Sequence, residues 1–269
     1  MGDMIEAIAA RRPSAEFDVN LTTANVRAFE VDGFTSIDRI TTDEEVAWLR
    51  EFYDAIFEDG VTFDLVRPYA SEGENRLPQR IKPEERFPEL KQTLFWRNGR
   101  KLAAQLMRLD ESLLEGWGHM IRKPARIGEA LPWHQDEAYW DPAHVYRALG
   151  CWMPLDDATA ENGAMKFIAG SHAREIQPHA HVGGDPITPA LCTEVDPREE
   201  VRAVLVPLKA AGAIFHHSRT LHASGPNHSD KARRAYANEW QLSPVKAQSV
   251  PHRPWIEEAR QAYAELRRT

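Results

Sequence analysis

Hydrophobic positions recur at two different spacings along this chain, one before residue 110 and another beyond residue 117. In residues 1–110 apolar side chains recur three and four positions apart, as they do on the buried face of a helix. Thr42 and Glu45 have the spacing of a capping box, so the clearest helix is expected to begin there and to run to Gly60. We therefore expect a mainly helical flank over residues 1–110, with a surface loop at 61–88 and a second helix within 90–109.

From residue 117 to 242 the apolar runs are short, β-prone and separated by turn-forming residues. Strands are predicted at 117–123, 145–155, 164–168, 201–207, 216–222 and 233–242. Short strands with frequent turns, flanked by helices, favour a sandwich or barrel. Residues 173–200 have no period, and a loop of that length is usually functional. A last amphipathic helix is predicted at 254–267, and a chain of 269 residues fits one domain.

Composition and charge limit the kinds of partner and the cellular compartment that are expected for this protein. Acidic residues outnumber basic ones by 41 to 33, and the formal charge of −8 argues against nucleic acid and anionic membranes. A small-molecule partner is therefore expected. No apolar run reaches the 18 residues of a membrane span and the N-terminus lacks a secretory pattern, so a cytoplasmic location is expected. Cys151 and Cys192 lack metal-like spacing and are expected to be free thiols.

The candidate chemistry begins at His134-Gln135-Asp136. In an extended strand alternate side chains share a face, so His134 and Asp136 would project together while Gln135 points away. One imidazole and one carboxylate are two of the three ligands of a 2-His-1-carboxylate facial triad, which holds non-haem Fe(II) and leaves positions open. A second histidine from elsewhere in the chain would complete the set.

The candidates for that second imidazole cluster downstream. His216 and His222 are an even number of residues apart and would share a face of one regular strand, whereas His217 would face away. Both His216 and His222 remain candidates.

An iron centre that activates O2 commonly uses a 2-oxo acid, whose distal carboxylate needs a charged partner. A forked guanidinium suits that carboxylate, and Arg233 and Arg234 follow the histidines. Ser224 would share the face of His222 and could add a hydroxyl donor.

Four motifs in order resemble those of the phytanoyl-CoA dioxygenase family. They are His134-Gln135-Asp136, Pro154-Leu155-Asp156-Asp157 with Glu161-Asn162-Gly163, Gly170-Ser171-His172, and the run from His222 to Ser229 with Arg233. The resemblance implies a double-stranded β-helix, a jelly-roll or cupin-like core, over residues 117–242. It also implies that His134, Asp136 and His222 bind Fe(II), and that Arg233 with help from Ser224 holds 2-oxoglutarate.

The implied reaction uses O2 and 2-oxoglutarate, releases succinate and CO2, and hydroxylates a C–H bond. Related halogenases lack the carboxylate ligand, so Asp136 favours oxygenation. The substrate is expected to be a small metabolite or natural-product intermediate. Candidate pocket residues are Trp133, Glu137, Tyr139 and Trp140, and Arg122 or Lys123 is a further candidate contact for 2-oxoglutarate or an acidic substrate. A cupin-like metalloenzyme that does not use 2-oxoglutarate, and a non-catalytic binding module, remain as alternatives.

Overall fold

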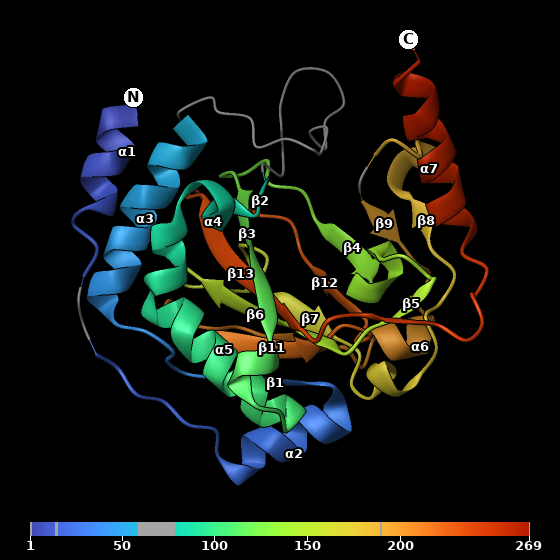
Figure 1. Ribbon diagram of the computed structural model, residues 1–269, viewed down its shortest axis with the longest axis horizontal. Coiled ribbons are helices and arrows are strands. Elements are labelled where there is room, and N and C mark those ends of the chain that lie inside the picture. The colour runs from blue at the N-terminus through green and yellow to red at the C-terminus, as the bar shows by residue number, and fades with distance from the viewer. Residues whose placement is uncertain (1, 14–15, 59–78, 189, 269) are drawn as a thin grey trace.

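Two antiparallel β-sheets form the centre of the molecule (Figure 1). This computed structural model describes residues 2–13, 16–58, 79–188 and 190–268. The larger sheet has the strand order β1-β11-β6-β13-β3-β2, and the smaller has the order β10-β7-β12-β4. The larger sheet comprises β1 (Phe34–Ile37), β2 (Gln79–Ile81), β3 (Glu115–Lys123), β6 (Ala148–Pro154), β11 (Ala213–His217) and β13 (Arg233–Gln241). The smaller comprises β4 (Leu131–His134), β7 (Met165–Phe167), β10 (Val204–Val206) and β12 (His222–Ser224).

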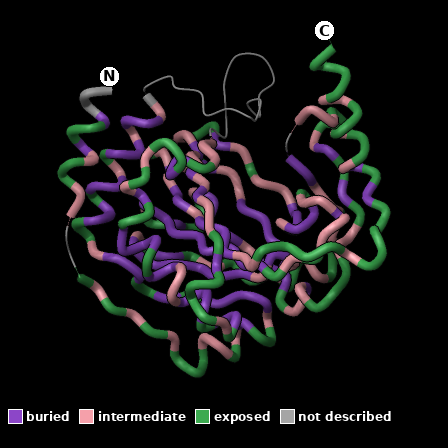
Figure 2. The backbone as a smooth tube through the Cα atoms, in the orientation of Figure 1, coloured by how far each residue is buried: buried purple, intermediate pink, exposed green. Residues whose placement is uncertain are grey.

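The two sheets pack face to face through a small apolar layer. Trp152, Ile214 and Ala235 of the larger sheet meet Met165 and Phe167 of the smaller one. Figure 2 shows the buried strands in the middle of the molecule and the more exposed helices around them. The predicted fold, mainly β with flanking helices around a jelly-roll core, is confirmed.

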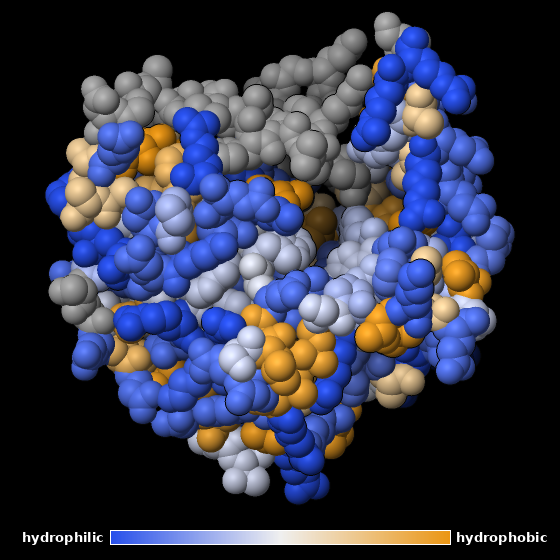
Figure 3. All heavy atoms as spheres, in the orientation of Figure 1, coloured by the Kyte–Doolittle hydropathy of each residue, from blue (hydrophilic) through white to orange (hydrophobic). Residues whose placement is uncertain are grey.

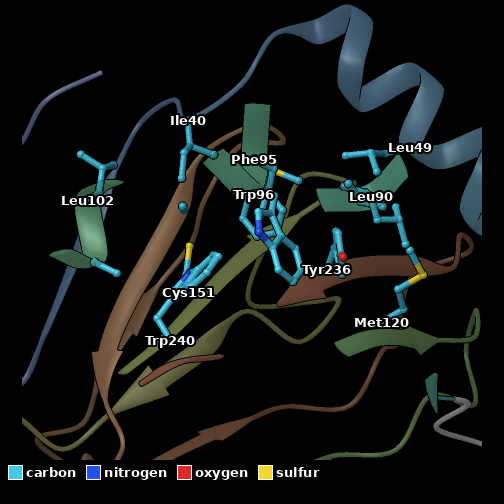
Figure 4. Close-up of a cluster of buried hydrophobic side chains, with 14 of the residues drawn as sticks. Ile40, Leu49, Leu90, Phe95, Trp96, Leu102, Met120, Cys151, Tyr236 and Trp240 are labelled. Atoms are coloured by element: carbon cyan, nitrogen blue, oxygen red, sulfur yellow. The ribbon is translucent and has the colours of Figure 1, made fainter. Parts of the chain in front are cut away.

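Helices cover the outer face of the larger sheet (Figure 1). The helices of the chain are α1 (Gly2–Ala9), α2 (Thr23–Asp32), α3 (Asp43–Glu58), α4 (Pro83–Arg86), α5 (Leu94–Met107), α6 (Pro197–Glu200) and α7 (Pro254–Leu266). Figure 4 shows the large apolar cluster in which α5 meets β13. There Phe95 contacts Tyr236 with ring centroids 5.2 Å apart, and Trp96 meets Trp240 edge-on at 5.1 Å.

Gly99 lies in the middle of α5, although glycine is unfavourable inside a helix. A Cβ atom at position 99 would lie 3.3 Å from the indole nitrogen of Trp240. The glycine therefore allows the helix to approach β13 closely and does not break it.

Side-chain alternation along β13 points one set of residues into the space between the sheets. Tyr236 and Trp240 belong to the helix-facing cluster, whereas Ala235 belongs to the layer between the sheets. Since alternate residues of a strand share a face, Arg233 and Glu239 also face the interior of the barrel.

The prediction of one strand from His216 to His222 is wrong. β11 ends at His217 in the larger sheet, and β12 begins at His222 in the smaller sheet. The intervening residues form a turn that carries the chain from one sheet to the other, so the parity argument does not apply across it. His216 and His222 nevertheless face each other inside the barrel, with ring centroids 4.6 Å apart.

Two predicted loops contain regular structure. In residues 173–200 the strands β8 (Ala180–His181) and β9 (Leu191–Cys192) form a ribbon that precedes α6. The predicted loop at 61–88 falls partly outside the described residues, as does Gly60, but residues 79–88 contain β2 and α4.

The C-terminal helix α7 is as predicted, and a last short ribbon pairs β5 (His144–Val145) with β14 (Val245–Lys246). Cys151 and Cys192 are free. Among the described residues, the helices are too short or too polar to cross a membrane.

Candidate active site

Three side chains that could hold a metal ion converge between the sheets. His134 ends β4, Asp136 begins a short 3-10 helix (Asp136–Tyr139), and His222 begins β12, which pairs with β4. Oδ1 of Asp136 lies 3.7 Å from Nε2 of His134 and 3.6 Å from Nε2 of His222. Two donor atoms that each lie about 2.1 Å from one ion are at most about 4.2 Å apart, so these distances fit ligation of a single metal.

Both imidazoles are oriented by the backbone. Nδ1 of His134 donates to the carbonyl of Pro132 at 2.8 Å, and Nδ1 of His222 donates to the carbonyl of Thr220 at 2.9 Å. A carbonyl only accepts, so in each ring Nε2 keeps its lone pair for a metal. Burial lowers the pKa of both His134 and His222, which favours the neutral form that ligates metals.

The residues between and after the ligands face away from the metal position. The side-chain amide of Gln135 donates to the carbonyl of Arg219 at 2.8 Å and accepts from the amide of Gln177 at 2.8 Å. Glu137 is buried and forms a bidentate ion pair with Arg219, at 2.8 and 2.9 Å. These contacts fix the short segment that carries Asp136.

His216, the rival ligand candidate, contacts the other oxygen of the same carboxylate. Its Nε2 donates to Oδ2 of Asp136 at 2.9 Å, and the ring is 5% exposed. The group whose ligand atoms all lie within 4.8 Å of one another contains His134, Asp136 and His222, but not His216.

Arg233 lies at one end of the barrel interior and is 2% exposed. Its Nε and Nη1 have no hydrogen-bond partner in the described part of the chain, and its guanidinium lies 5.3 Å from the ring of Trp152. Burial lowers the pKa of Arg233 to about 10, so the side chain stays charged at neutral pH. A buried charge normally requires a partner, and a carboxylate is the ligand that its free donors fit.

Lys123 lies beside Arg233, and its side chain reaches the backbone of Ser224. Lys123 is directly opposite Arg233 in the pairing of β3 with β13. Its Nζ donates to the carbonyls of Glu129 at 2.8 Å, Gly225 at 2.5 Å and Ser224 at 3.4 Å. Arg234 faces the helical side instead, where it binds Asp156 and Asp54.

The four predicted pocket residues lie in different surroundings. Trp133 is on the opposite face of β4 from His134, where it packs with Leu221 and donates to Glu200 at 3.0 Å. The carboxylate of Glu137 forms an ion pair with Arg219 at 2.8 Å.

Tyr139 and Trp140, the other two predicted pocket residues, each contact a further ring. The ring of Tyr139 lies edge-on to His134 at 5.9 Å and is 37% exposed. The ring of Trp140 lies tilted against that of Tyr146, with the centroids 4.8 Å apart.

Glu239 was missed by the sequence reasoning. It faces the barrel interior, is 7% exposed, and its Oε1 has no partner among the described residues. Burial raises the pKa of Glu239 well above its ordinary value, and the charge of Asp136 adds to the shift. Counting six residues along the strand from Arg233 would have placed Glu239 on the same face.

The surface opens near these residues. Figure 3 shows a hollow between the strands labelled β3 and β4 in Figure 1. β4 carries His134, and β3 pairs with β13, which carries both Arg233 and Glu239. One wall of the hollow is therefore β4, which carries His134. The other wall is β3, which is hydrogen-bonded to the strand that carries Arg233 and Glu239.

Curated proteins resemble part of the chain. Phytanoyl-CoA dioxygenase domain-containing protein 1 of Danio rerio is 33% identical over 121 residues, which are 44% of this chain and 41% of that protein. A probable alpha-ketoglutarate-dependent hypophosphite dioxygenase of Stutzerimonas stutzeri is 33% identical over 127 residues, 43% of each protein. The matched stretch thus spans about two fifths of the length of these relatives.

Similarity to a solved structure extends over most of the chain. EvdO2 of Micromonospora carbonacea var. aurantiaca, solved in complex with 2-oxoglutarate, is 35% identical with a TM-score of 0.79. The match covers 90% of this chain and 99% of that one. The sequence profile of the family described as Phytanoyl-CoA dioxygenase (PhyH) matches residues 29–235. The chain therefore belongs to the phytanoyl-CoA dioxygenase family.

Proposed function

We propose that this protein is an Fe(II)- and 2-oxoglutarate-dependent oxygenase that hydroxylates a C–H bond of a small metabolite or natural-product intermediate. The observation that carries the proposal is the pairing of two features inside one barrel. Two buried imidazoles and one part-buried carboxylate offer three ligand atoms within 4.8 Å, and a buried guanidinium has two nitrogens, Nε and Nη1, without a partner among the described residues.

His134, Asp136 and His222 would hold the iron. Two neutral imidazoles and one carboxylate are the ligand types of non-haem Fe(II) sites, and three ligands leave coordination positions for cosubstrate and O2. Bound iron and 2-oxoglutarate supply the oxidising power, since O2 converts the cosubstrate to succinate and CO2 while one oxygen atom enters the substrate C–H bond.

Arg233 would bind the distal carboxylate of 2-oxoglutarate, with the hydroxyl of Ser224 as a second donor. The guanidinium is charged, buried and partly unpaired, so a carboxylate there would satisfy donors that otherwise lie buried without partners. Because Arg233 is buried, this contact would be stronger than the same pair at the surface.

The substrate would enter on the side of Tyr139 and Glu239. Tyr139 is exposed beside His134, and Glu239, six residues beyond Arg233 on the same strand, is a buried carboxyl whose Oε1 has no partner in the part of the chain that the structure describes. Burial keeps the Glu239 pKa high, so its neutral carboxyl can both donate to and accept from a substrate hydroxyl. Trp133 and Glu137 are left out because their polar atoms have partners elsewhere.

The test is an anaerobic titration of the protein with Fe(II) and then 2-oxoglutarate. A weak visible metal-to-ligand charge-transfer band is expected for the wild-type protein. Arg233→Gln should weaken 2-oxoglutarate binding about 100-fold, since two charge-assisted hydrogen bonds are lost. Arg234→Lys is the matched control, because Arg234 faces the helical side, and it should keep the band.

Three outcomes would contradict the proposal. A wild-type protein loaded with iron that gives no band would point to a metalloenzyme that does not use 2-oxoglutarate. A band unchanged in Arg233→Gln would remove Arg233 as the anchor. Iron binding retained in His222→Ala would remove His222 as a ligand.

The reaction outcome needs a separate measurement. A panel of metabolites is screened for succinate release above the level without substrate, and each product is examined by mass spectrometry. Gain of one oxygen atom is expected, whereas loss of two hydrogens would indicate desaturation or ring closure instead.

A further inference from the structure

The two oxygens of Asp136 have different partners. Oδ1 lies 3.7 and 3.6 Å from the Nε2 atoms of His134 and His222, at the metal position. Oδ2 accepts a hydrogen bond of 2.9 Å from Nε2 of His216, which reaches it from the opposite sheet. The carboxylate is therefore held with one oxygen towards the metal position and the other turned to a histidine.

His216 is itself fixed by its surroundings. Its ring lies against Gly150 of the neighbouring strand β6, where a Cβ atom would be 2.5 Å from His216 Cε1. On its other side the ring packs against Phe167 at 5.7 Å and His222 at 4.6 Å. A glycine at position 150 is therefore required for the ring to reach Asp136.

The hydrogen bond to Asp136 also determines which atom of His216 carries a proton. A carboxylate only accepts, so Nε2 of His216 carries the proton and has no lone pair for a metal. Nδ1 is buried and has no partner in the described part of the chain, so the single polar contact of the ring is Asp136.

We propose that His216 is a positioning residue that keeps Asp136 a one-oxygen ligand and thereby preserves an open coordination position at the metal. A carboxylate can bind a cation through one or both oxygens, and the two-oxygen mode would occupy a position that cosubstrate or O2 needs. Groups that orient metal ligands typically alter metal affinity or activity by about 10- to 100-fold when removed. The inference rests on the proposed metal site, but not on 2-oxoglutarate or on a substrate.

The test uses Co(II) added to the apoprotein, with calorimetry for affinity and visible absorption for coordination number. His216→Phe keeps a ring over Gly150 but removes the donor, and it should weaken Co(II) binding about 10- to 100-fold and change the d–d bands. His216→Gln restores an N–H donor and should recover most of the affinity and the wild-type spectrum. Gly150→Ala should act like His216→Phe, because the new Cβ displaces the ring without touching Asp136.

His217→Phe is the control, because His217 lies on the same strand but faces the other side, and its Co(II) affinity should stay within about twofold. Circular dichroism confirms that each variant is folded. Unchanged affinity and spectrum in folded His216→Phe and Gly150→Ala would overturn the inference and leave His216 a packing residue. Complete loss in both His216→Phe and His216→Gln, with Co(II) binding kept in His222→Ala, would also overturn it and make His216 the ligand.

The two proposals fail separately. A wild-type protein that does not bind Co(II) contradicts the proposed metal site. A wild-type protein that binds Co(II) while His216→Phe behaves identically contradicts only the role of His216.

Discussion

Glu239 is a buried carboxyl whose Oε1 has no hydrogen-bond partner among the described residues. A buried polar group without a partner costs about 1 to 3 kcal/mol of stability. We expect Glu239→Leu to raise the free energy of unfolding by about 1 kcal/mol, measured by urea denaturation, and to lower substrate-dependent succinate release.

Glu239→Gln is the matched variant for this prediction. Its amide is still polar and buried, so stability should stay close to that of the wild type. A Glu239→Leu protein that is less stable than the wild type would mean that the carboxyl supports the fold.

The buried side chain of Lys123 predicts how the free energy of unfolding depends on pH. Burial and the charge of Arg233 lower the pKa of Lys123 to about 6 from an ordinary value of 10.5. Between these values the unfolded chain binds more protons than the folded one, so stability rises with pH. The contribution of this group is at most about 1.4 kcal/mol per pH unit.

Replacing Lys123 with Met should therefore flatten the pH dependence of unfolding between about pH 6 and pH 9, measured in urea at several pH values. Lys209→Met changes a lysine whose side chain is 83% exposed and should leave the slope as in the wild type. Identical slopes in wild type and Lys123→Met would refute the depressed pKa.

At the scale of elements, one carboxylate joins two helices. The amide of Glu45 donates to Thr42 at 3.2 Å, as the predicted capping box requires. The carboxylate of Glu45, however, accepts from the amides of Leu94 and Phe95 at 2.6 and 3.0 Å, at the start of α5. Glu45 on α3 therefore caps the helix that covers β13.

Glu45→Ala should lower the free energy of unfolding by about 3 kcal/mol, because two buried N–H groups lose a charged acceptor. The measurement is chemical denaturation. Glu44→Ala, at an exposed position of the same helical turn, should change stability by no more than about 0.5 kcal/mol. If Glu45→Ala lost no more stability than Glu44→Ala, water would be shown to replace the Glu45 carboxylate as the acceptor for the two amides.

At the scale of the whole molecule, the site connects the two sheets. His134 and His222 belong to the smaller sheet, and His216 and Arg233 to the larger one. Ligands that bind only the folded state stabilise it, by about 2.7 kcal/mol at 100 times their Kd. Anaerobic Fe(II) with 2-oxoglutarate should therefore raise the melting temperature by several degrees.

A chelator should reverse this shift without unfolding the protein, because the apolar clusters that hold the sheets and helices together do not contain the metal ligands. Far-ultraviolet circular dichroism checks the fold, and His222→Ala should show no shift on adding iron. Loss of secondary structure on chelation would mean that the metal is part of the fold.

Much of the fold and part of the site follow from local rules. The projection of His134 and Asp136 to one face depends on the two-residue period of an extended chain, and β13 was predicted from its β-prone residues after a turn. Thr22 and Thr42 begin helices because their hydroxyls accept from backbone amides three residues on. These features involve residues a few positions apart, so the backbone geometry encoded in the sequence determines them.

The remainder depends on which distant segments meet. Strand parity left both His216 and His222 as candidates, and the resemblance to a family favoured His222. In the folded chain His222 lies with His134 and Asp136, whereas His216 contacts the second oxygen of Asp136, because the chain turns from one sheet to the other between the two histidines. Glu137 is paired with Arg219, 82 residues away. The sequence by itself determined the period of each element, the cap residues and the ligand types. Only tertiary packing decided how the buried polar groups pair, because the fold must bring together partners as far apart in the chain as Asp136 and His216, 80 positions, or Glu45 and Leu94, 49 positions.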